Sequence, residues 1–395
     1  MSVALFDLGQ RLRAAASGRP TARSAFAPVT PPIDPVAVMI AGSGDRVLVR
    51  AAHRAGLSTG GGPSALAALS ELGVSISAAP RTLVVADHQA LSRLLALAEA
   101  TDASSPEAGA AAVVAWWSLR ADHPGSGAVL NVSAACSARW VLGVPPGSER
   151  QVGVWRAWLG VADRGPRGLL DMAAAVSAGT VLPGLDALAD DDRDSWDSFV
   201  ARTRDTKANW DWRRRDSRRE AALGLATRCD AAELWQSLRL GDPLVAVRES
   251  FAGTVVSGVV TSVPSRDVLE VTLDRLACRL RERTAVEGFA GYPRDVPPAL
   301  LAAPLVRGTV SATRVTLDER LVLTIDAAAV RSGAVRRGQR ITLRPRSVDP
   351  RQQRSGRYEL HRRYAARRSW LSGGAAPVPR RRDVPLDVVV AAATD

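Results

Sequence analysis

The spacing of apolar residues changes near residue 253, and this change divides the chain into a helical part and a strand-rich part. Before this point, apolar residues recur mostly three and four positions apart, as in helices with one buried face. After it, apolar and polar residues alternate and many are β-branched, as in half-buried strands. The pattern therefore predicts an α+β protein with more than one domain.

The strand-rich part contains the same strand pattern twice. Strands are predicted at residues 253–263, 267–274 and 277–286 in the first copy, and at 308–317, 320–326 and 338–343 in the second. The tripeptide GTV at 253–255 recurs at 308–310, and LEVTLD at 269–274 recurs as LVLTID at 321–326. A unit of three strands cannot bury its apolar face alone. Two copies are therefore expected to close into a six-stranded β-barrel over residues 251–347.

This duplicated pattern resembles two known kinds of barrel. It is similar to the β-barrels that lie beside nucleotide-binding domains in translation factors, and also to a distorted OB-fold. The resemblance covers residues 251–347 and rests on the strand pattern rather than on a specific motif. It implies a closed barrel and little about a ligand.

Residues 36–103 predict a small module that follows an N-terminal arm or linker over residues 1–35. Helical spacing occurs at 46–55 and 64–72, on either side of a glycine turn. Short strands are expected at 74–76 and 82–86, and a helix at 89–100. This order fits a winged helix-turn-helix or a small α/β module. In the winged-helix alternative, residues 64–70 would face the major groove of DNA.

Residues 104–250 predict a helical domain rich in tryptophan. A capping box at 104–107 opens a helix that carries Trp116 and Trp117. Further helices are expected to contribute Trp155 and Trp158 and to carry Trp196 inward, and a long charged helix is broken by the sequence Gly-Asp-Pro at 241–243.

Charge is distributed very unevenly along the chain. The 395 residues carry 52 basic and 40 acidic side chains, a net charge of +12. Residues 336–382 contain 15 arginines against Asp349 and Glu359, which is +13 and leaves −1 for the rest. Residues 348–395 are therefore predicted to be an arginine-rich extension of the barrel, with a terminal strand near 388–390.

Composition excludes several classes of protein. The three cysteines, Cys136, Cys229 and Cys278, are too far apart for a zinc knuckle and too few for a disulfide framework. No apolar run approaches the ~20 residues needed to cross a bilayer, and no secretion signal is evident at the N-terminus. We expect a cytoplasmic protein that has no membrane contact and needs no metal or other cofactor.

Few patterns point to catalysis. The sequence lacks the nucleophile elbow, the P-loop, the HExxH zinc motif and the dinucleotide-binding glycine motif. An acidic cluster over 190–197 is best explained as the negatively charged start of a helix, although carboxylates there could hold a divalent metal. Asp205 and Lys207 formally match half of a restriction-type nuclease site, so a metal-dependent nuclease is the third hypothesis for function.

Two basic regions could bind a polyanion. In residues 203–220, Asp and Glu residues cancel about half of the charge, so a solvated helix with internal ion pairs is the slightly favoured explanation. In residues 336–370, arginines alternate with aromatic residues and acidic residues are nearly absent, which is typical of nucleic-acid binding. The candidate contact residues are Arg336, Arg337, Arg340, Arg344, Arg346, Arg351, Arg354, Arg357, Tyr358, Arg362, Arg363, Tyr364, Arg367, Arg368, Trp370, Arg214, Arg215 and Arg218.

The sequence therefore favours a non-catalytic accessory subunit that binds DNA or RNA through its phosphate backbone. The main alternative is a non-enzymatic scaffold or assembly subunit. Tryptophan and arginine are also the residues that dominate protein interfaces, so composition does not separate the two hypotheses.

Overall fold

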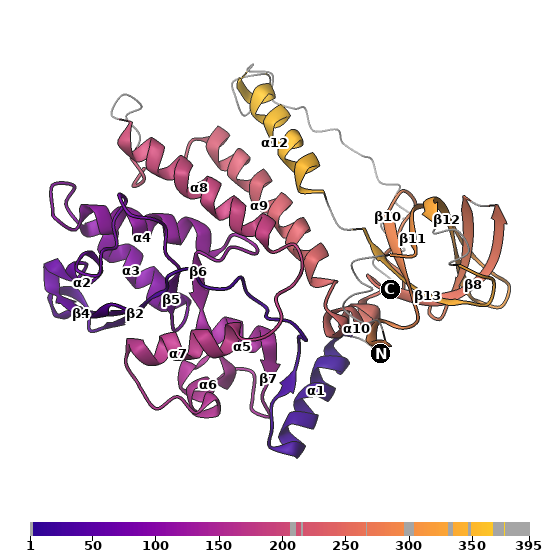
Figure 1. Cartoon of the computed structure of the whole chain (residues 1–395), viewed down its shortest axis with the longest axis horizontal. Helices are drawn as coiled ribbons and strands as arrows, with labels where there is room; N and C mark the ends of the chain where they lie inside the picture. Colours follow the sequence, from indigo (N-terminus) through magenta and orange to yellow (C-terminus); the bar gives the residue numbers. More distant parts are fainter. Residues whose placement is uncertain are drawn as a thin grey trace, which may run out of the picture.

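The chain forms a mixed sheet flanked by helices, a helical region and a separate β-barrel (Figure 1). A computed structural model describes residues 3–205, 211–214, 216–265, 267–295, 304–330, 335–346, 349–365 and 375. The predicted terminal strand near 388–390 lies outside the described residues. In the described part of the chain, no helix is both long and apolar enough to cross a membrane.

The N-terminal half is built on a five-stranded sheet with helices on both faces. Its strands are β2 (Val36–Ala41), β3 (Leu48–His53), β4 (Gly56–Gly61), β5 (Leu83–Val85) and β6 (Val129–Asn131), in the order β4-β3-β2-β5-β6. The first three strands are antiparallel, and β5 and β6 run parallel to β2. Since β6 follows residue 103, this sheet uses sequence on both sides of the predicted module boundary.

Alternate residues of the sheet enter two separate apolar cores. Val36 and Val38 pack with α2 (Ala67–Ser70), α3 (His88–Ala100) and α4 (Ala108–Ala121). Ala37, between them, packs on the opposite face with α5 (Val132–Arg139), α6 (Val152–Leu159) and α7 (Pro166–Ser177). Helices cover both faces of the sheet, and consecutive residues of β2 and β5 are therefore buried, as is typical of parallel strands.

Two local predictions in this module are wrong. Residues 46–55 were expected to form a helix, but they contain the strand β3, where consecutive residues Ala51, Ala52 and His53 are all buried. A short apolar run buried on both faces carries no period that separates strand from helix. The strand expected at 74–76 is a turn and coil. A winged-helix module is not confirmed, because α2 has four residues and its Ala68 and Leu69 are buried.

Helices α8 (Asp186–Arg204), α9 (Arg218–Arg239) and α10 (Pro243–Ala252) link the sheet to the barrel. The ring centre of Trp196 on α8 lies 4.9 Å from that of Trp116 on α4, so the two helices pack together through these rings. Helix α10 starts at the predicted break, where the buried Asp242 accepts hydrogen bonds from the backbone of Leu244 and Val245. The N-terminal segment is a helix, α1 (Val3–Ser17), that packs on α10, and short strands β1 (Thr21–Ala22) and β7 (Trp140–Val141) pair beside it.

The predicted six-stranded barrel is confirmed. It is closed in the order β10-β11-β12-β9-β8-β13, with antiparallel neighbours throughout. The strands are β8 (Val256–Ser265), β9 (Val268–Leu273), β10 (Ala285–Ala290), β11 (Val306–Val315), β12 (Leu321–Val330) and β13 (Arg340–Pro345). If each strand of the first copy (β8, β9, β10) is exchanged with its counterpart in the second copy (β11, β12, β13), every strand keeps the equivalent neighbours around the barrel. The two sequence copies therefore form the two halves of one barrel, related by a pseudo-twofold axis.

The interior of the barrel follows the alternation seen in the sequence. Leu269, Val271 and Leu273 of β9 point into one apolar core, with Leu323 and Ile325 of β12. The identity of this barrel as an OB-fold is not confirmed.

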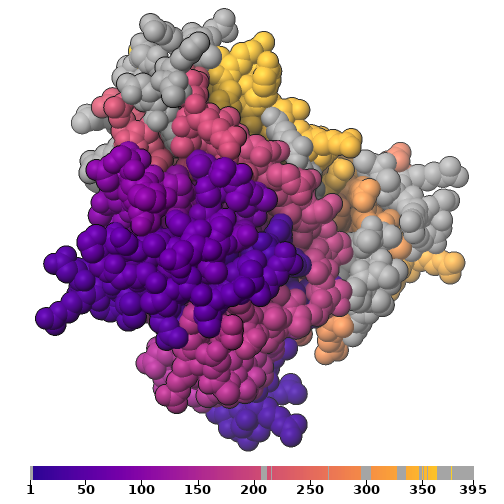
Figure 2. Space-filling model, turned by 60° about the vertical axis from the view of Figure 1, so that its left-hand side comes forward, coloured from indigo at the N-terminus to yellow at the C-terminus, as the bar shows by residue number. Residues whose placement is uncertain are grey.

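The arginine-rich segment leaves the barrel after β13 and forms α12 (Pro350–Ala365). This helix does not lie on the barrel: it packs along α9, on the side of that helix away from the N-terminal sheet (Figures 1 and 2). Within the described residues, the segment thus contacts a different part of the protein from the one that it leaves.

Candidate nucleic-acid interface

The candidate arginines of β13 fall into buried and exposed groups because the strand alternates. Ile341 and Leu343 point into the barrel, whereas Arg340 and Arg344 point outward. The side chain of Arg344 points from the barrel toward Leu240, the residue that follows helix α9. It donates a hydrogen bond to the Leu240 carbonyl oxygen at 2.8 Å and lies 3.1 Å from a carboxylate oxygen of Glu287.

Arg344 is therefore an internal contact between the barrel and the helices. Its guanidinium also lies 4.6 Å from the ring centre of Phe289, and the residue is 8% exposed. Burial lowers the pKa of Arg344, and the neighbouring Glu287 carboxylate partly offsets this shift. We assign Arg344 a structural role and propose no phosphate contact for it.

Arg340 lies at the surface beside an aromatic ring. It forms an ion pair with Asp274, and its guanidinium lies 4.5 Å from the ring centre of Tyr292. The hydrogen bond to Asp274 raises the pKa of Arg340. Arg294 approaches the same ring at 5.7 Å. Sequence reasoning missed Tyr292 and Arg294, because they lie outside the arginine-rich run and are brought to Arg340 only when β10 pairs with β13.

The other candidate arginines of the barrel are exposed. Arg336 and Arg337 lie in the turn that precedes β13, and Arg346 follows the end of that strand. With Arg340, these residues make four arginines on β13 or next to its ends.

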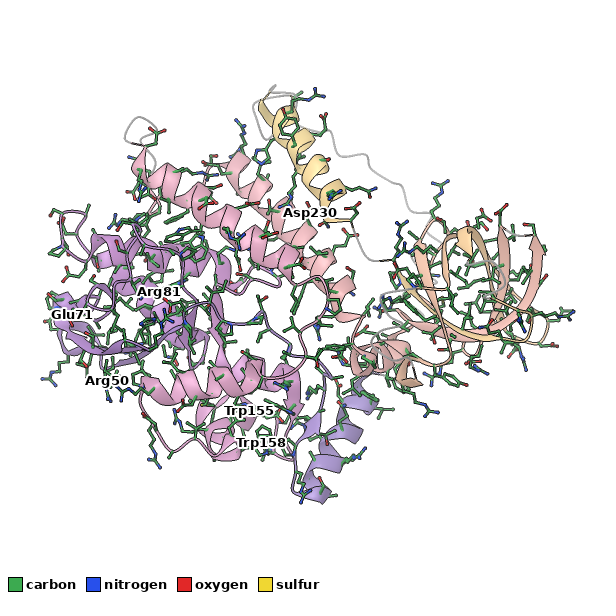
Figure 3. All side chains as sticks on the ribbon, in the orientation of Figure 1. Arg50, Glu71, Arg81, Trp155, Trp158 and Asp230 are labelled. Carbon is green, nitrogen blue, oxygen red and sulfur yellow. The ribbon has the colours of Figure 1, made fainter. Side chains whose placement is uncertain are left out.

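Helix α12 has two different faces. Gln353 and Arg357, one turn apart, face α9: Gln353 donates a hydrogen bond to the Asp230 carbonyl oxygen at 2.9 Å. Arg357 lies 3.5 Å from an Asp230 carboxylate oxygen and 3.3 Å from one of Asp191 on α8. Asp230 can be seen beneath the helix in Figure 3. Arg357, a predicted phosphate contact, is therefore used to dock the helix.

The opposite face of α12 is open to solvent. Arg351, Tyr358 and Arg362 are exposed and recur at spacings of seven and four residues, which places them on one side of the helix. Tyr358 is 74% exposed, and Arg362 pairs with Glu359 at 2.9 Å. The side chains of Arg354, Arg363 and Tyr364 lie outside the described set, as do residues Arg367, Arg368 and Trp370 entirely.

Two residues of the acidic cluster on α8, Asp191 and Asp192, form ion pairs with the buried Arg120 and His123. Arg120 donates to Asp192 at 2.7 Å and to Asp191 at 3.0 Å, and His123 lies 3.0 Å from Asp191. Asp192 also accepts the backbone N–H of Gly127 at 2.7 Å. Burial alone would raise the pKa of Asp191, but the His123 hydrogen bond and the Arg120 charge outweigh it and lower that pKa.

The carboxylates of Asp191 and Asp192 are thus already used in ion pairs and hydrogen bonds within the protein. In the described part of the chain, no group of three or more His, Cys, Asp or Glu side chains could hold a metal ion. Lys207, which the nuclease hypothesis requires, lies outside the described residues.

The second basic region is described only in part. Arg214 and Arg218 are exposed, and the guanidinium of Arg213 lies 4.2 Å from the ring centre of Trp212. Arg215 lies outside the described residues. Ser217 and Glu220 form a reciprocal capping box that begins α9.

Comparisons with known proteins add no assignment: no known family, curated protein or solved structure matches this chain.

Proposed function

We propose that this chain is a non-catalytic, cytoplasmic accessory protein that binds the phosphate backbone of DNA or RNA. The observation that carries the proposal is the two-faced helix α12. One face is docked by Arg357 and Gln353, and the other presents Arg351, Tyr358 and Arg362 to solvent.

A fixed helix is better suited to phosphate contacts than an unstructured basic tail. Because Arg357 and Gln353 hold α12 against α9, its exposed arginines are held in place before a ligand arrives, which lowers the entropy lost on binding. Guanidinium groups suit phosphate oxygens because they can donate two parallel hydrogen bonds. Such contacts carry affinity and position rather than base sequence, so we expect binding that tolerates many sequences.

The exposed arginines at the two ends of β13 extend this proposal to the barrel. Arg336, Arg337 and Arg346 would add phosphate contacts, and the likeness of the barrel to an OB-fold belongs to the same proposal.

The test is the salt dependence of binding to a labelled mixed-sequence oligonucleotide, measured both as a single strand and as a duplex. Each lost phosphate contact should reduce the slope of log K against log salt by about 0.9 for duplex DNA. The double variant Arg351→Ala/Arg362→Ala should therefore bind more weakly, with a slope reduced by about 2.

The matched control removes the same charge elsewhere. Arg164 and Arg167 are exposed near the start of α7, so Arg164→Ala/Arg167→Ala should leave the affinity and the slope unchanged. The proposal is refuted if the wild-type protein binds neither oligonucleotide at low salt, or if both double variants behave alike.

One observation favours the alternative of an assembly subunit. Leu5, Leu8 and Leu12 are exposed on one side of α1, at 54%, 48% and 61%. Exposed leucines at helical spacing are typical of a surface that contacts another protein. Large assemblies that persist after nuclease treatment and high salt, and that Leu8→Glu dissolves, would support this alternative.

A further inference from the structure

The outer wall of the barrel has a hollow where Tyr292 faces the end of β9. This hollow has a volume of about 270 Å³. Its lining includes Tyr292 and Pro293, Asp274 and Arg275, and Ser250 of α10. Beyond the Asp274–Arg340 ion pair, the same wall continues into a wider groove of about 650 Å³.

The ring of Tyr292 is partly open to this hollow. The residue is 36% exposed, although Pro293, beside it, is buried. The guanidiniums of Arg340 and Arg294 lie 4.5 and 5.7 Å from the centre of its ring. An aromatic ring flanked by arginines at a surface can stack on a flat partner that carries negative charge nearby.

The charges around the ring favour a phosphate. Arg275 and Asp274 line the hollow, and Arg294 and Arg340 lie beside it, over the ring of Tyr292. At the far end of the wider groove, by contrast, Asp318 and Glu319 lie beside Arg320. Phosphate groups should therefore be attracted to the end of the groove that holds Tyr292.

We infer that this hollow is a binding site for single-stranded nucleic acid, in which one base stacks on Tyr292 while the adjoining phosphates contact Arg275 and Arg340. This inference rests on the proposed function and adds to it the form of the nucleic acid and the place where a base is held. A base in a duplex is already stacked between its neighbours, whereas a single strand can turn one base out toward an aromatic ring. The site accordingly selects single strands without reading their sequence.

The test compares binding of a labelled oligothymidylate single strand and of a mixed-sequence duplex of the same length. Loss of one stacked base should weaken single-strand binding of Tyr292→Ala by about ten-fold and leave duplex binding unchanged. Tyr292→Trp keeps a flat ring and should retain single-strand affinity. The matched control is Trp158→Ala, which removes an aromatic side chain of similar exposure on α6, away from both proposed contact surfaces, and should leave single-strand binding unchanged.

The outcomes separate this inference from the proposed function. If Tyr292→Ala binds single strands as tightly as wild type while Arg351→Ala/Arg362→Ala weakens binding, the site is wrong and the function stands. If Tyr292→Ala and Trp158→Ala lower single-strand affinity equally, the inference is also overturned. If the wild-type protein binds neither probe, both proposals fail. Equal melting temperatures of wild type and Tyr292→Ala exclude loss of folding as the cause of weaker binding.

Discussion

The buried ion pair between Arg344 and Glu287 predicts a large change in stability when one partner is removed. Glu287 is 6% exposed, and Arg344 provides its close contact at 3.1 Å; Arg307, half exposed, lies farther away at 3.8 Å. Arg344→Met would leave the carboxylate buried beside this weaker partner, and would also leave the Leu240 carbonyl without its hydrogen bond. Both effects lower the free energy of unfolding.

The expected magnitude follows from these contacts. Breaking a buried ion pair by removing one partner costs about 3–5 kcal/mol. Since Arg307 still faces the carboxylate, we expect the lower end, about 3 kcal/mol. Replacing both partners, as in Arg344→Met/Glu287→Leu, removes the buried charge with its partner and should restore most of this loss, to within about 1 kcal/mol of wild type.

The assay is equilibrium unfolding in urea, followed by far-ultraviolet circular dichroism, for the wild type, both single variants and the double variant. Arg346→Met is the matched control, because Arg346 is an exposed arginine two residues along the chain and its loss should change stability by at most about 0.5 kcal/mol. The reasoning is refuted if Arg344→Met is no worse than Arg346→Met, or if the double variant is less stable than either single variant. Arg344→Met should also bind oligonucleotides as wild type does under conditions where it is folded.

Three further predictions follow from the packing of the chain. Because the pKa of Asp191 is lowered in the folded state, its contribution to stability is present above the ordinary carboxylate value of about 3.9 and is lost as the pH falls below it, so Asp191→Asn should flatten the loss of stability in acid-unfolding curves. Burial raises the pKa of Cys136 to about 12, so a thiol reagent at mildly alkaline pH should label the exposed Cys229 rapidly and leave Cys136 unlabelled until the protein unfolds. Arg357→Ala should release α12 from Asp230, which limited proteolysis would detect as faster cleavage near residues 349–365, whereas equal cleavage of variant and wild type would contradict the docking role.

The barrel could be predicted from sequence because its information is local and repeated. Apolar and polar residues alternate along β9, and the apolar positions Leu269, Val271 and Leu273 indicate which side of the strand is buried. The repeat of the same pattern about 55 residues later implies a second half with the same shape, and a barrel is the arrangement that buries both halves. The position of the excess charge was equally evident, because counting arginines needs no structure.

Other features depend on contacts between distant residues, and sequence patterns do not carry these. In β3, alternation gives way to three consecutive buried residues at 51–53, so the run does not distinguish strand from helix, and the sheet partners of β3 decide. In the sequence, residues 336–382 form one basic block. In the part of this block that the structure describes, packing separates two groups of arginines. Arg344 and Arg357 contact other parts of the protein, whereas Arg351 faces solvent. Charge and period are properties of a residue and its neighbours along the chain, and they determined the barrel and the net charge. Which carboxylate or carbonyl each guanidinium meets depends on elements more than 50 residues apart, as with Arg344 and Glu287 at a separation of 57, and only the tertiary structure decided it.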